Sequence, residues 1–307
     1  MKITFKDENC KYTGVWQENE EDAVVSYSKI AFFEIGFAGE TLVLDATPVT
    51  RVAYFLDGEE VQPIKQGNTL VFTAANGKHT LKIKIYNNER FAVRMLEADG
   101  FFRVPDKRYI HFIGDSITHA YPGFSSVTPE KMGADYSVVA HCGMSLVDGW
   151  GWYAPPVGMK VRMGMESRYF VLQLPGDNEQ PIPYVFNYCR VPDDIVVFLG
   201  TNDYLDNEAN REDGNVQTFV QHYLAFVKRL REHFPTARVH IMKPLSDKCC
   251  RHEGITAAYE RIVSELSDIY LIPADTWGVE ISPDGTHPSE NGYVRLVEGM
   301  IGYFNER

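Results

Sequence analysis

From residue 108 onward, short apolar runs with the character of β-strands alternate with longer runs that have the period of an α-helix. The strand-like runs cover residues 108–115, 136–143, 194–203, 238–245 and 268–275, and the helical runs cover 216–234, 255–266 and 291–304. Strands that alternate with helices form a mostly parallel sheet with helices on both faces. The sequence therefore predicts an α/β domain over residues 105–307.

The first hundred residues have a different pattern, because no helical period of useful length occurs there. Short runs rich in β-branched and aromatic residues cover 31–39, 41–46, 51–58, 69–74, 79–86 and 91–98. The pairs Asp57-Gly58 and Asn76-Gly77 are typical of hairpin turns. We expect residues 1–104 to form an all-β domain, a sandwich or a jelly roll, ahead of the α/β domain.

The charge of the chain bears on what it binds. Its formal net charge is −12 at pH 7, which disfavours nucleic acid and anionic membrane surfaces because both attract basic proteins. The sequence has no apolar run long enough to span a bilayer, and its start lacks the apolar stretch of a secretory signal. We therefore expect a cytoplasmic protein with a neutral small-molecule or oligosaccharide substrate, and with no nucleic-acid and no membrane partner.

The five cysteines are odd in number and lack paired CxxC spacing, which is typical of reduced thiols. Cys249, Cys250 and His252 lie close together in the sequence, but no second pair of metal ligands accompanies them. We expect neither a metal site nor a cofactor.

Small and polar residues follow the predicted strands of the α/β domain. Ser116 follows the first strand, Gly143 the second and Asn202 the third, and Asp284 and His287 come just before the last helix. The carboxyl ends of parallel strands meet at one edge of the sheet, and ligands bind beyond that edge. We therefore expect these five residues to lie near one another.

Together these residue types supply what acyl transfer requires. A serine hydroxyl becomes a good nucleophile when an imidazole takes its proton, and a carboxylate holds that imidazole in the correct tautomer. We assign Ser116 as the nucleophile, His287 as the base and then the acid, and Asp284 as the orienting carboxylate. The oxyanion hole would consist of the backbone N–H groups of Ser116 and Gly143 and the side-chain amide of Asn202.

The motifs that carry these residues read "IGDSIT", "HCGMS", "GTND" and "DGTHP", in this order. In residues 108–307 the chain resembles the SGNH, or GDSL-type, hydrolases, whose four blocks carry Ser, Gly, Asn and His. This resemblance implies a flavodoxin-like three-layer α/β/α fold and the hydrolysis of esters without a metal.

A β-rich domain ahead of an SGNH domain further resembles the carbohydrate esterases of family two, which remove acetyl groups from plant polysaccharides. In one respect the chain departs from that family, whose members often rely on a Ser-His pair with the histidine bonded to a backbone carbonyl. Here Asp284 stands three residues before His287, so a full triad is expected.

Each of these residues also has a purely structural interpretation. Ser116 and Asp284 suit turns, and Asn202 suits a helix N-cap. Asp115 is expected to anchor its turn by accepting hydrogen bonds from backbone amides. His119 and His141 lie near the same edge but lack a carboxylate at matching spacing, so both rank below His287 as the base. His111 lies within an apolar strand and is expected to be a hydrogen-bonded core histidine.

The long connection over residues 144–193 is unusual and carries three aromatic residues soon after the second motif. Trp150, Trp152 and Tyr153 either stack against sugar rings of a substrate or complete the hydrophobic core. The β domain either forms a wall of the active site or serves as a packing or oligomerisation module. The sequence leaves both questions open, and with them the existence of a homo-oligomer.

The function predicted from these residues and from the resemblance is that of a serine esterase that removes acetyl groups from carbohydrates through a Ser-His-Asp triad. Two alternatives stay open. One is a general short-chain carboxylesterase of the lipase-like kind, and the other is a carbohydrate-binding protein that has lost turnover. Fold alone does not decide among them.

Overall fold

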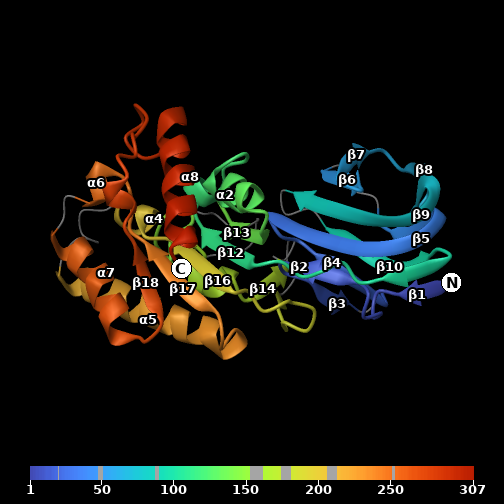
Figure 1. Ribbon diagram of the computed structural model, residues 1–307. Coiled ribbons are helices and arrows are strands. Elements are labelled where there is room, and N and C mark those ends of the chain that lie inside the picture. The colour runs from blue at the N-terminus through green and yellow to red at the C-terminus, as the bar shows by residue number, and fades with distance from the viewer. Residues whose placement is uncertain are drawn as a thin grey trace. The chain divides into compact units, whose positions relative to one another are not determined.

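The computed structural model describes residues 1–19, 21–47, 51–86, 90–152, 162–173, 181–205, 213–250 and 253–307. The chain divides into two compact units. The first consists of Met1–Lys107 together with Tyr184–Arg190, and the second of Arg108–Pro183 and Val191–Arg307. Figure 1 shows a strand-rich first unit and a second unit in which helices surround a sheet.

The described part of the first unit contains strands and no helix. They are β1 (Lys2–Thr4), β2 (Lys11–Thr13), β3 (Gln17–Asn19), β4 (Ala23–Ser26), β5 (Ile30–Ala46), β6 (Val52–Leu56), β7 (Glu59–Val61), β8 (Ile64–Gln66), β9 (Thr69–Tyr86), β10 (Phe91–Glu97) and β11 (Gly100–Phe102). The predicted hairpin at Asp57-Gly58 is confirmed, because it joins the antiparallel strands β6 and β7 and both residues have positive φ.

The hairpin expected at Asn76-Gly77 is wrong, since both residues lie inside the single long strand β9. Likewise, the two runs predicted at 31–39 and 41–46 form one strand, β5, which pairs antiparallel with β9 along most of its length. The pairing becomes irregular just after the point where Gly39 faces Gly77, and Gly39 has φ +103°. A bulge at this point lets both strands bend and continue where the turn signal predicts an end.

The bulge also changes which residues of β5 point into the core. Before it, the odd positions from Ala31 to Phe37 are buried, and after it Leu42 and Leu44 are buried. Since successive side chains of a strand point to opposite faces, one irregular step moves the apolar set from odd to even positions. The same core cluster holds the fully buried Trp16, so this aromatic residue is a core residue.

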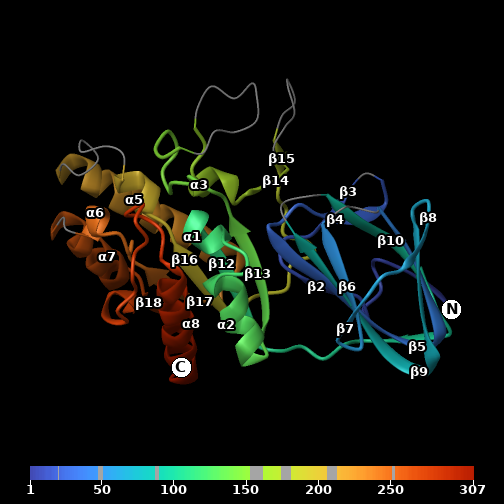
Figure 2. The same cartoon turned by 90° about the horizontal axis from the view of Figure 1, so that it is seen from above.

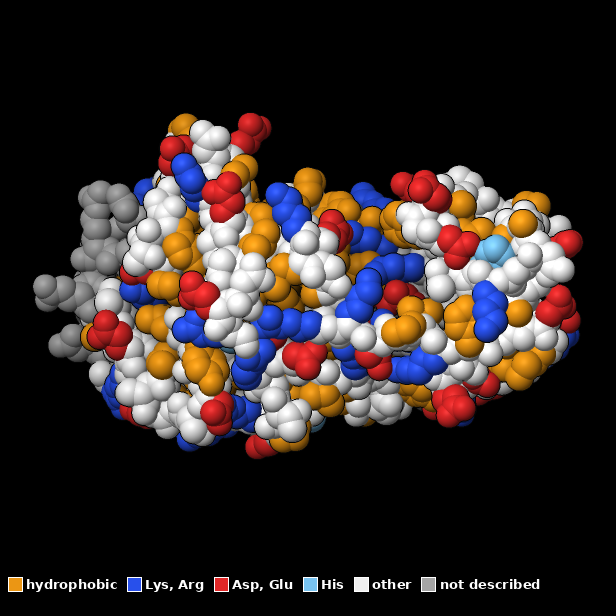
Figure 3. Space-filling model, in the orientation of Figure 1, with side chains coloured by type: hydrophobic (Ala, Val, Ile, Leu, Met, Phe, Trp, Pro, Cys, Tyr) orange, Lys and Arg blue, Asp and Glu red, His pale blue; other side chains and the backbone are white. Residues whose placement is uncertain are grey.

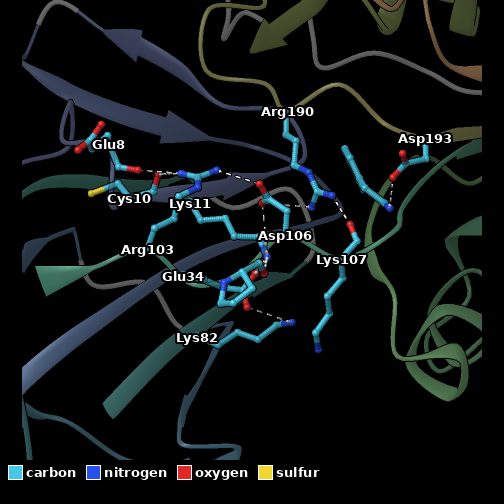
Figure 4. A network of polar contacts seen from close by, with 12 residues as sticks. Glu8, Cys10, Lys11, Glu34, Lys82, Arg103, Asp106, Lys107, Arg190 and Asp193 are labelled. Carbon is cyan, nitrogen blue, oxygen red and sulfur yellow. Dashed lines mark hydrogen bonds and ion pairs between the residues drawn. The ribbon is translucent and has the colours of Figure 1, made fainter. Parts of the chain in front are cut away.

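A network of charged side chains holds residues 103–107 and 184–190 to the strands of the first unit (Figure 4). Lys11, only 1% exposed, donates to Pro105 O at 3.0 Å and pairs with Glu34 Oε2 at 3.3 Å. The Arg190 guanidinium lies 3.7 Å from Asp106 Oδ1. Within the same unit, Tyr188 packs against the core cluster. Residues 105–107 and 184–190 belong to the first unit, whereas the predicted boundary assigns them to the α/β domain.

The second unit is built on five parallel strands. They are β12 (Tyr109–Gly114), β13 (Asp135–Ala140), β16 (Asp194–Phe198), β17 (Arg238–Met242) and β18 (Ile269–Ile272), in the spatial order β13-β12-β16-β17-β18. This is the doubly wound order 2-1-3-4-5, in which the connections change direction between the first and third strands. The predicted strands are present, and every residue of β12, β13 and β16 is buried.

Helices cover both faces of this sheet. They are α1 (Ser116–His119), α2 (Phe124–Met132), α3 (Met165–Arg168), α4 (Thr201–Tyr204), α5 (Asp213–His233), α6 (Asp247–Cys250), α7 (Glu253–Glu265) and α8 (Glu290–Asn305), with a 3₁₀ turn η2 (Ala274–Thr276) and a small hairpin of β14 (Val171–Gln173) and β15 (Ile182–Pro183). Helix α2 packs against α8, and α5 against α7. Figure 2 shows α2 and α8 on one side of the sheet and α5 on the other.

One face of the molecule carries hydrophobic side chains as well as charges of both signs. On the face shown in Figure 3, acidic and basic side chains lie interspersed. Among the described residues, no helix combines the length and the apolar character needed to cross a membrane.

Candidate active site

The predicted site residues follow the carboxyl ends of three neighbouring strands. Gly114, the last residue of β12, is in register with Ala140 of β13 and with Phe198 of β16. The chain turns after each of these residues, so the segments that follow all leave the same edge of the sheet. The edge between β12 and β16 is also where the doubly wound order changes direction, the usual place for a ligand in such sheets.

Ser116 begins the short helix α1 directly beyond β12. Asp115 caps this helix, because its Oδ1 accepts a hydrogen bond from Ile117 N at 3.0 Å. The predicted role of Asp115 as an anchor of the turn agrees with this contact. As the first residue of the helix, Ser116 has a backbone N–H without a carbonyl partner inside the helix, which leaves this donor available to a ligand.

Gly114 makes the tight connection from β12 to α1 sterically possible. A Cβ atom at this position would lie 2.1 Å from Thr118 Oγ1 and 2.8 Å from the carbonyl oxygen of Phe198. Both distances are shorter than real contacts allow. Only glycine at this position therefore lets α1 and the end of β16 lie so close to the end of β12.

Three predicted side chains meet in a hydrogen-bonded row. Ser116 Oγ lies 2.8 Å from His287 Nε2, and His287 Nδ1 lies 2.7 Å from Asp284 Oδ2. These partners favour the tautomer with the proton on Nδ1, which leaves Nε2 as the acceptor for the serine proton. The arrangement is that of a nucleophile, a base and an orienting carboxylate.

Asp284 is well placed to stay ionised. Its Oδ1 accepts hydrogen bonds from the backbone N–H groups of His287 at 3.0 Å and Thr286 at 2.7 Å, and these bonds, with the one from the imidazole, hold its pKa well below the usual range. The short turn that contains Asp284 therefore fixes both the charge and the direction of the carboxylate.

The two other predicted oxyanion donors follow β13 and β16, Gly143 on a loop and Asn202 in a short helix. Gly143 has φ +73°, a left-handed conformation that favours glycine. Asn202 lies in α4 and is 5% exposed, and its Nδ2 donates to Met144 O at 2.9 Å. Since a carboxamide nitrogen carries two hydrogens, the second one stays available for a ligand.

Two buried carboxyl groups flank this site, and the sequence did not reveal their depth. Asp115 and Asp203 are both 0% exposed. Burial raises the pKa of Asp115 to about 6 and that of Asp203 to about 7. Asp115 stands next to Ser116 and Asp203 next to Asn202, so both belong to motifs that the sequence singles out, but their burial is not visible there.

The remaining histidines near the sheet have other partners. His119 Nδ1 lies 3.6 Å from Cys142 Sγ, and His141 is buried. His111 is a hydrogen-bonded core histidine as expected, with Ser137 Oγ at 2.6 Å and Tyr169 OH at 2.9 Å. Its burial lowers its pKa to about 3, so it remains neutral in the core.

The three aromatic residues predicted either to bind sugar or to complete the core are Trp150, Trp152 and Tyr153. Trp150 is half-buried, and its carbonyl accepts from Ser145 Oγ at 2.9 Å. Trp152 is 43% exposed, and its backbone N–H donates to Gly143 O at 3.0 Å. Tyr153 lies outside the described residues. Trp152 is therefore attached by its backbone to the loop that carries Gly143.

The cysteine-rich stretch shows no metal-binding arrangement where it is described. Cys249 is buried, and its thiol donates to Thr201 O at 3.6 Å. His252 lies outside the described residues. In the part of the chain that the structure covers, no group of three or more His, Cys, Asp or Glu side chains is arranged to hold a metal ion.

A comparison with protein families gives a match to most of the second unit. The sequence pattern of the GDSL-like lipase/acylhydrolase family matches residues 110–300, which include Ser116, Gly143, Asn202 and His287. No curated protein matches the chain.

Among solved structures, the chain is similar over 100% of its length to a family two carbohydrate esterase from Cellvibrio japonicus (TM-score 0.71, 15% identity, 97% of that chain). It is also similar, again over 100% of its length, to an acetyl xylan esterase from the rumen bacterium Butyrivibrio proteoclasticus (TM-score 0.69, 16% identity, 98% of that chain). A family two carbohydrate esterase from Clostridium thermocellum in complex with cellohexaose matches 97% of this chain and 98% of its own (TM-score 0.67, 18% identity). At these identities the likeness shows a shared fold.

Proposed function

This chain belongs to the GDSL-like lipase/acylhydrolase family, and we propose that it is a serine esterase that removes acetyl groups from carbohydrates. The observation that carries the proposal is the row of side chains from Ser116 through His287 to Asp284, with distances of 2.8 and 2.7 Å. This row lies beyond the carboxyl end of β12, at the edge of the parallel sheet from which the segments that carry Gly143 and Asn202 also leave.

The first half of the reaction is acylation of the serine. Ser116 Oγ attacks the carbonyl carbon of the acetyl group while its proton passes to His287 Nε2. Asp284, held ionised by its backbone hydrogen bonds, stabilises the imidazolium that forms. The tetrahedral intermediate then collapses, and His287 returns the proton to the oxygen of the departing sugar.

The second half is hydrolysis of the acetyl-serine. Water attacks the acyl carbon while His287 again takes a proton, and the breakdown of the second intermediate releases acetate and restores the serine. In both intermediates the oxyanion would be bound by the N–H groups of Ser116 and Gly143 and by the amide of Asn202. Each such donor contributes roughly 10²–10³-fold to the rate.

Three features support a carbohydrate as the alcohol part of the ester. The similar solved structures are described as carbohydrate or acetyl xylan esterases, and one of them is a complex with cellohexaose. In this chain the exposed Trp152 lies beside the Gly143 loop, and its flat apolar ring suits the face of a sugar. The net charge of −12 also favours a neutral substrate.

The test is acetate release from acetylated xylo-, manno- and gluco-oligosaccharides, measured beside aryl acetate and aryl butyrate. Wild type and Ser116→Ala are compared, and we expect release from at least one sugar that the variant lacks. Cleavage of aryl esters alone would support the general short-chain carboxylesterase. Sugar binding without release of acid from any ester, or equal release by the variant, would reject the triad and favour the binding protein.

A further inference from the structure

The loop after β13 carries Gly143, and its shape depends on one buried carboxylate. Asp203 Oδ2 accepts from Leu146 N at 2.8 Å, and Asp203 Oδ1 accepts from Leu146 N and Val147 N, both at 3.1 Å. Asp203 is 0% exposed, and buried backbone N–H groups left without an acceptor are costly. The loop is therefore fixed to α4 at Leu146 and Val147.

The neighbouring residue fixes the same loop from the donor side. Asn202 Nδ2 donates to Met144 O at 2.9 Å, one residue beyond Gly143. Consecutive residues of α4 therefore hold consecutive parts of the loop, Asn202 by donating and Asp203 by accepting. This double connection sets the distance between Gly143 and the Asn202 amide, the two oxyanion donors that come from different strands.

Asp203 does not take part in the triad and has no part in the proposed proton transfers. It lies near other groups that are 0% exposed, since its charge disfavours ionisation of the hydroxyls of Tyr204, Tyr223 and Tyr259, and the charge of Asp115 disfavours ionisation of Asp203. Such a group is expensive to bury. Its cost is understandable if the placement of the loop matters to catalysis.

We propose that Asp203 is a positioning residue of the oxyanion hole, whose carboxylate holds the Gly143–Val147 loop so that the Gly143 N–H and the Asn202 amide reach the same acyl oxygen. The inference rests on the esterase function proposed above. An oxyanion hole acts through donors that are already in place when the charge develops. A small shift of the loop therefore weakens binding of the transition state more than binding of the ester.

The test variant is Asp203→Asn. Its amide would present N–H groups to one of the backbone donors, so the loop must move while the side-chain volume stays nearly constant. We expect kcat to fall about 10-fold to 100-fold with KM within about 2-fold, a smaller loss than the roughly 10²–10³-fold that follows removal of a whole donor. Asn202→Ala, which removes a proposed oxyanion donor together with the bond to Met144 O, should show the larger loss.

Phenylboronic acid supplies a second readout that does not depend on turnover. Ser116 Oγ forms a bond to boron, its proton passes to His287, and a boron-bound hydroxyl occupies the oxyanion position. We expect Asp203→Asn to lower the affinity for phenylboronic acid by the same factor by which it lowers kcat. Binding of the free sugar product, which does not reach the oxyanion hole, should stay unchanged.

Asp194→Asn is the matched control for lost stability. Asp194 is also fully buried, and it accepts hydrogen bonds from Arg108 Nε and His240 Nε2, both at 2.8 Å. It is the first residue of β16, whereas Asp203 follows the carboxyl end of the same strand. Both variants are assayed at a temperature where circular dichroism shows them folded. Asp194→Asn should keep the wild-type kcat and phenylboronic acid affinity.

The outcomes separate this inference from the proposed function. An active wild type, an inactive Ser116→Ala and a wild-type kcat in Asp203→Asn would overturn the positioning role alone. Equal losses of kcat in Asp203→Asn and Asp194→Asn would also overturn it, because the effect would then be one of stability. Full activity in Ser116→Ala would instead overturn the esterase mechanism. If Asp203→Asn does not fold, Asp203→Glu is measured by the same two readouts, because its longer side chain shifts the acceptor oxygens of Leu146 N and Val147 N. Wild-type kcat and phenylboronic acid affinity in that variant would overturn the positioning role.

Discussion

At the scale of the residue, the proposed active site depends on how one histidine is oriented. His287 has a carboxylate partner on Nδ1 and the serine hydroxyl on Nε2. Some esterases of the family that this chain resembles use a backbone carbonyl in place of the carboxylate. The position of Asp284 in the turn just before His287 makes the carboxylate the partner here, and this difference can be measured.

Replacing Asp284 by asparagine should lower kcat by about 10²–10⁴-fold, because the amide can donate to Nδ1 and so favour the tautomer in which Nε2 cannot accept the serine proton. Steady-state hydrolysis of aryl acetate measures the loss. KM for the same ester should change little, since both carboxylate oxygens of Asp284 face the turn and the imidazole of His287. A loss below about 10-fold would contradict the triad and favour a Ser-His pair.

His79 gives a pH-dependent contribution to stability in the first unit. Its Nδ1 lies 2.7 Å from Asp57 Oδ2 and its Nε2 lies 2.7 Å from Ala75 O, so both ring nitrogens face acceptors. The hydrogen bond to Asp57 raises the pKa of His79 above its usual 6.5. The stabilisation is therefore complete when the pH is below the pKa of His79 in the unfolded chain, and it is lost as the pH rises through the pKa of His79 in the folded protein.

We expect the unfolding temperature of the first unit to fall more for the wild type than for His79→Gln when the pH is raised from about 6 to about 9. Differential scanning calorimetry at several pH values measures this. Asp57→Asn removes the same ion pair and should flatten the same part of the curve. A parallel decline in all three proteins would show that His79 is not the titrating group.

At the scale of the element, the close approach of β12, α1 and β16 places Ser116. Gly114→Ala should cost about 1–3 kcal/mol of unfolding free energy, because the new methyl group overlaps a backbone oxygen that cannot turn away. It should also reduce kcat, since α1 carries Ser116, the proposed nucleophile. Urea unfolding and aryl acetate hydrolysis measure the two effects.

Gly302→Ala is the control for this change. Gly302 lies in α8, and nothing approaches the position that its Cβ would occupy. This substitution should stabilise the helix by up to about 1 kcal/mol and leave kcat unchanged. Wild-type kcat in Gly114→Ala would show that the steric limit at the strand end does not control the nucleophile.

At the scale of the whole molecule, the first unit is completed by a segment that lies far along the chain. Tyr188 packs against Phe5 and Tyr12, with ring centroids 5.8 Å apart in both pairs. In the same segment, Val185 N donates to Gln17 Oε1 at 2.8 Å. A fragment that ends at Lys107 lacks all these contacts.

We expect the isolated fragment 1–107 to unfold at a lower temperature than the same unit in the full chain, as followed by limited proteolysis during heating. In the full chain, Tyr188→Ala should destabilise this unit by about 1–3 kcal/mol through lost apolar burial. Tyr121→Ala is the control, because Tyr121 is 46% exposed and lies outside this cluster. Equal stability of fragment and intact unit would show that residues 184–190 contribute nothing.

The sequence by itself determined the order of the elements in the second unit and the residues at the strand ends. The apolar runs at 108–115, 136–143 and 194–203 are long enough to mark buried parallel strands, and parallel strands place their carboxyl ends at one edge. The sequence alone could therefore predict that Ser116, Gly143 and Asn202 follow strand ends at the same edge of the sheet. The local contact between Asp284 and His287 was equally accessible, since three residues separate them.

Tertiary structure alone decided the features that depend on residues distant in the chain. The burial of Asp203 and its bonds to Leu146 and Val147 join two different loops, and no local pattern reports depth. The continuation of β9 through Asn76-Gly77 depends on pairing with β5, which overrides a strong local turn signal. Residues 184–190 likewise join the first unit through apolar and charged contacts that form only when the chain returns to it. Local chemistry predicts which groups are present, whereas burial and long-range pairing arise only from the packed fold.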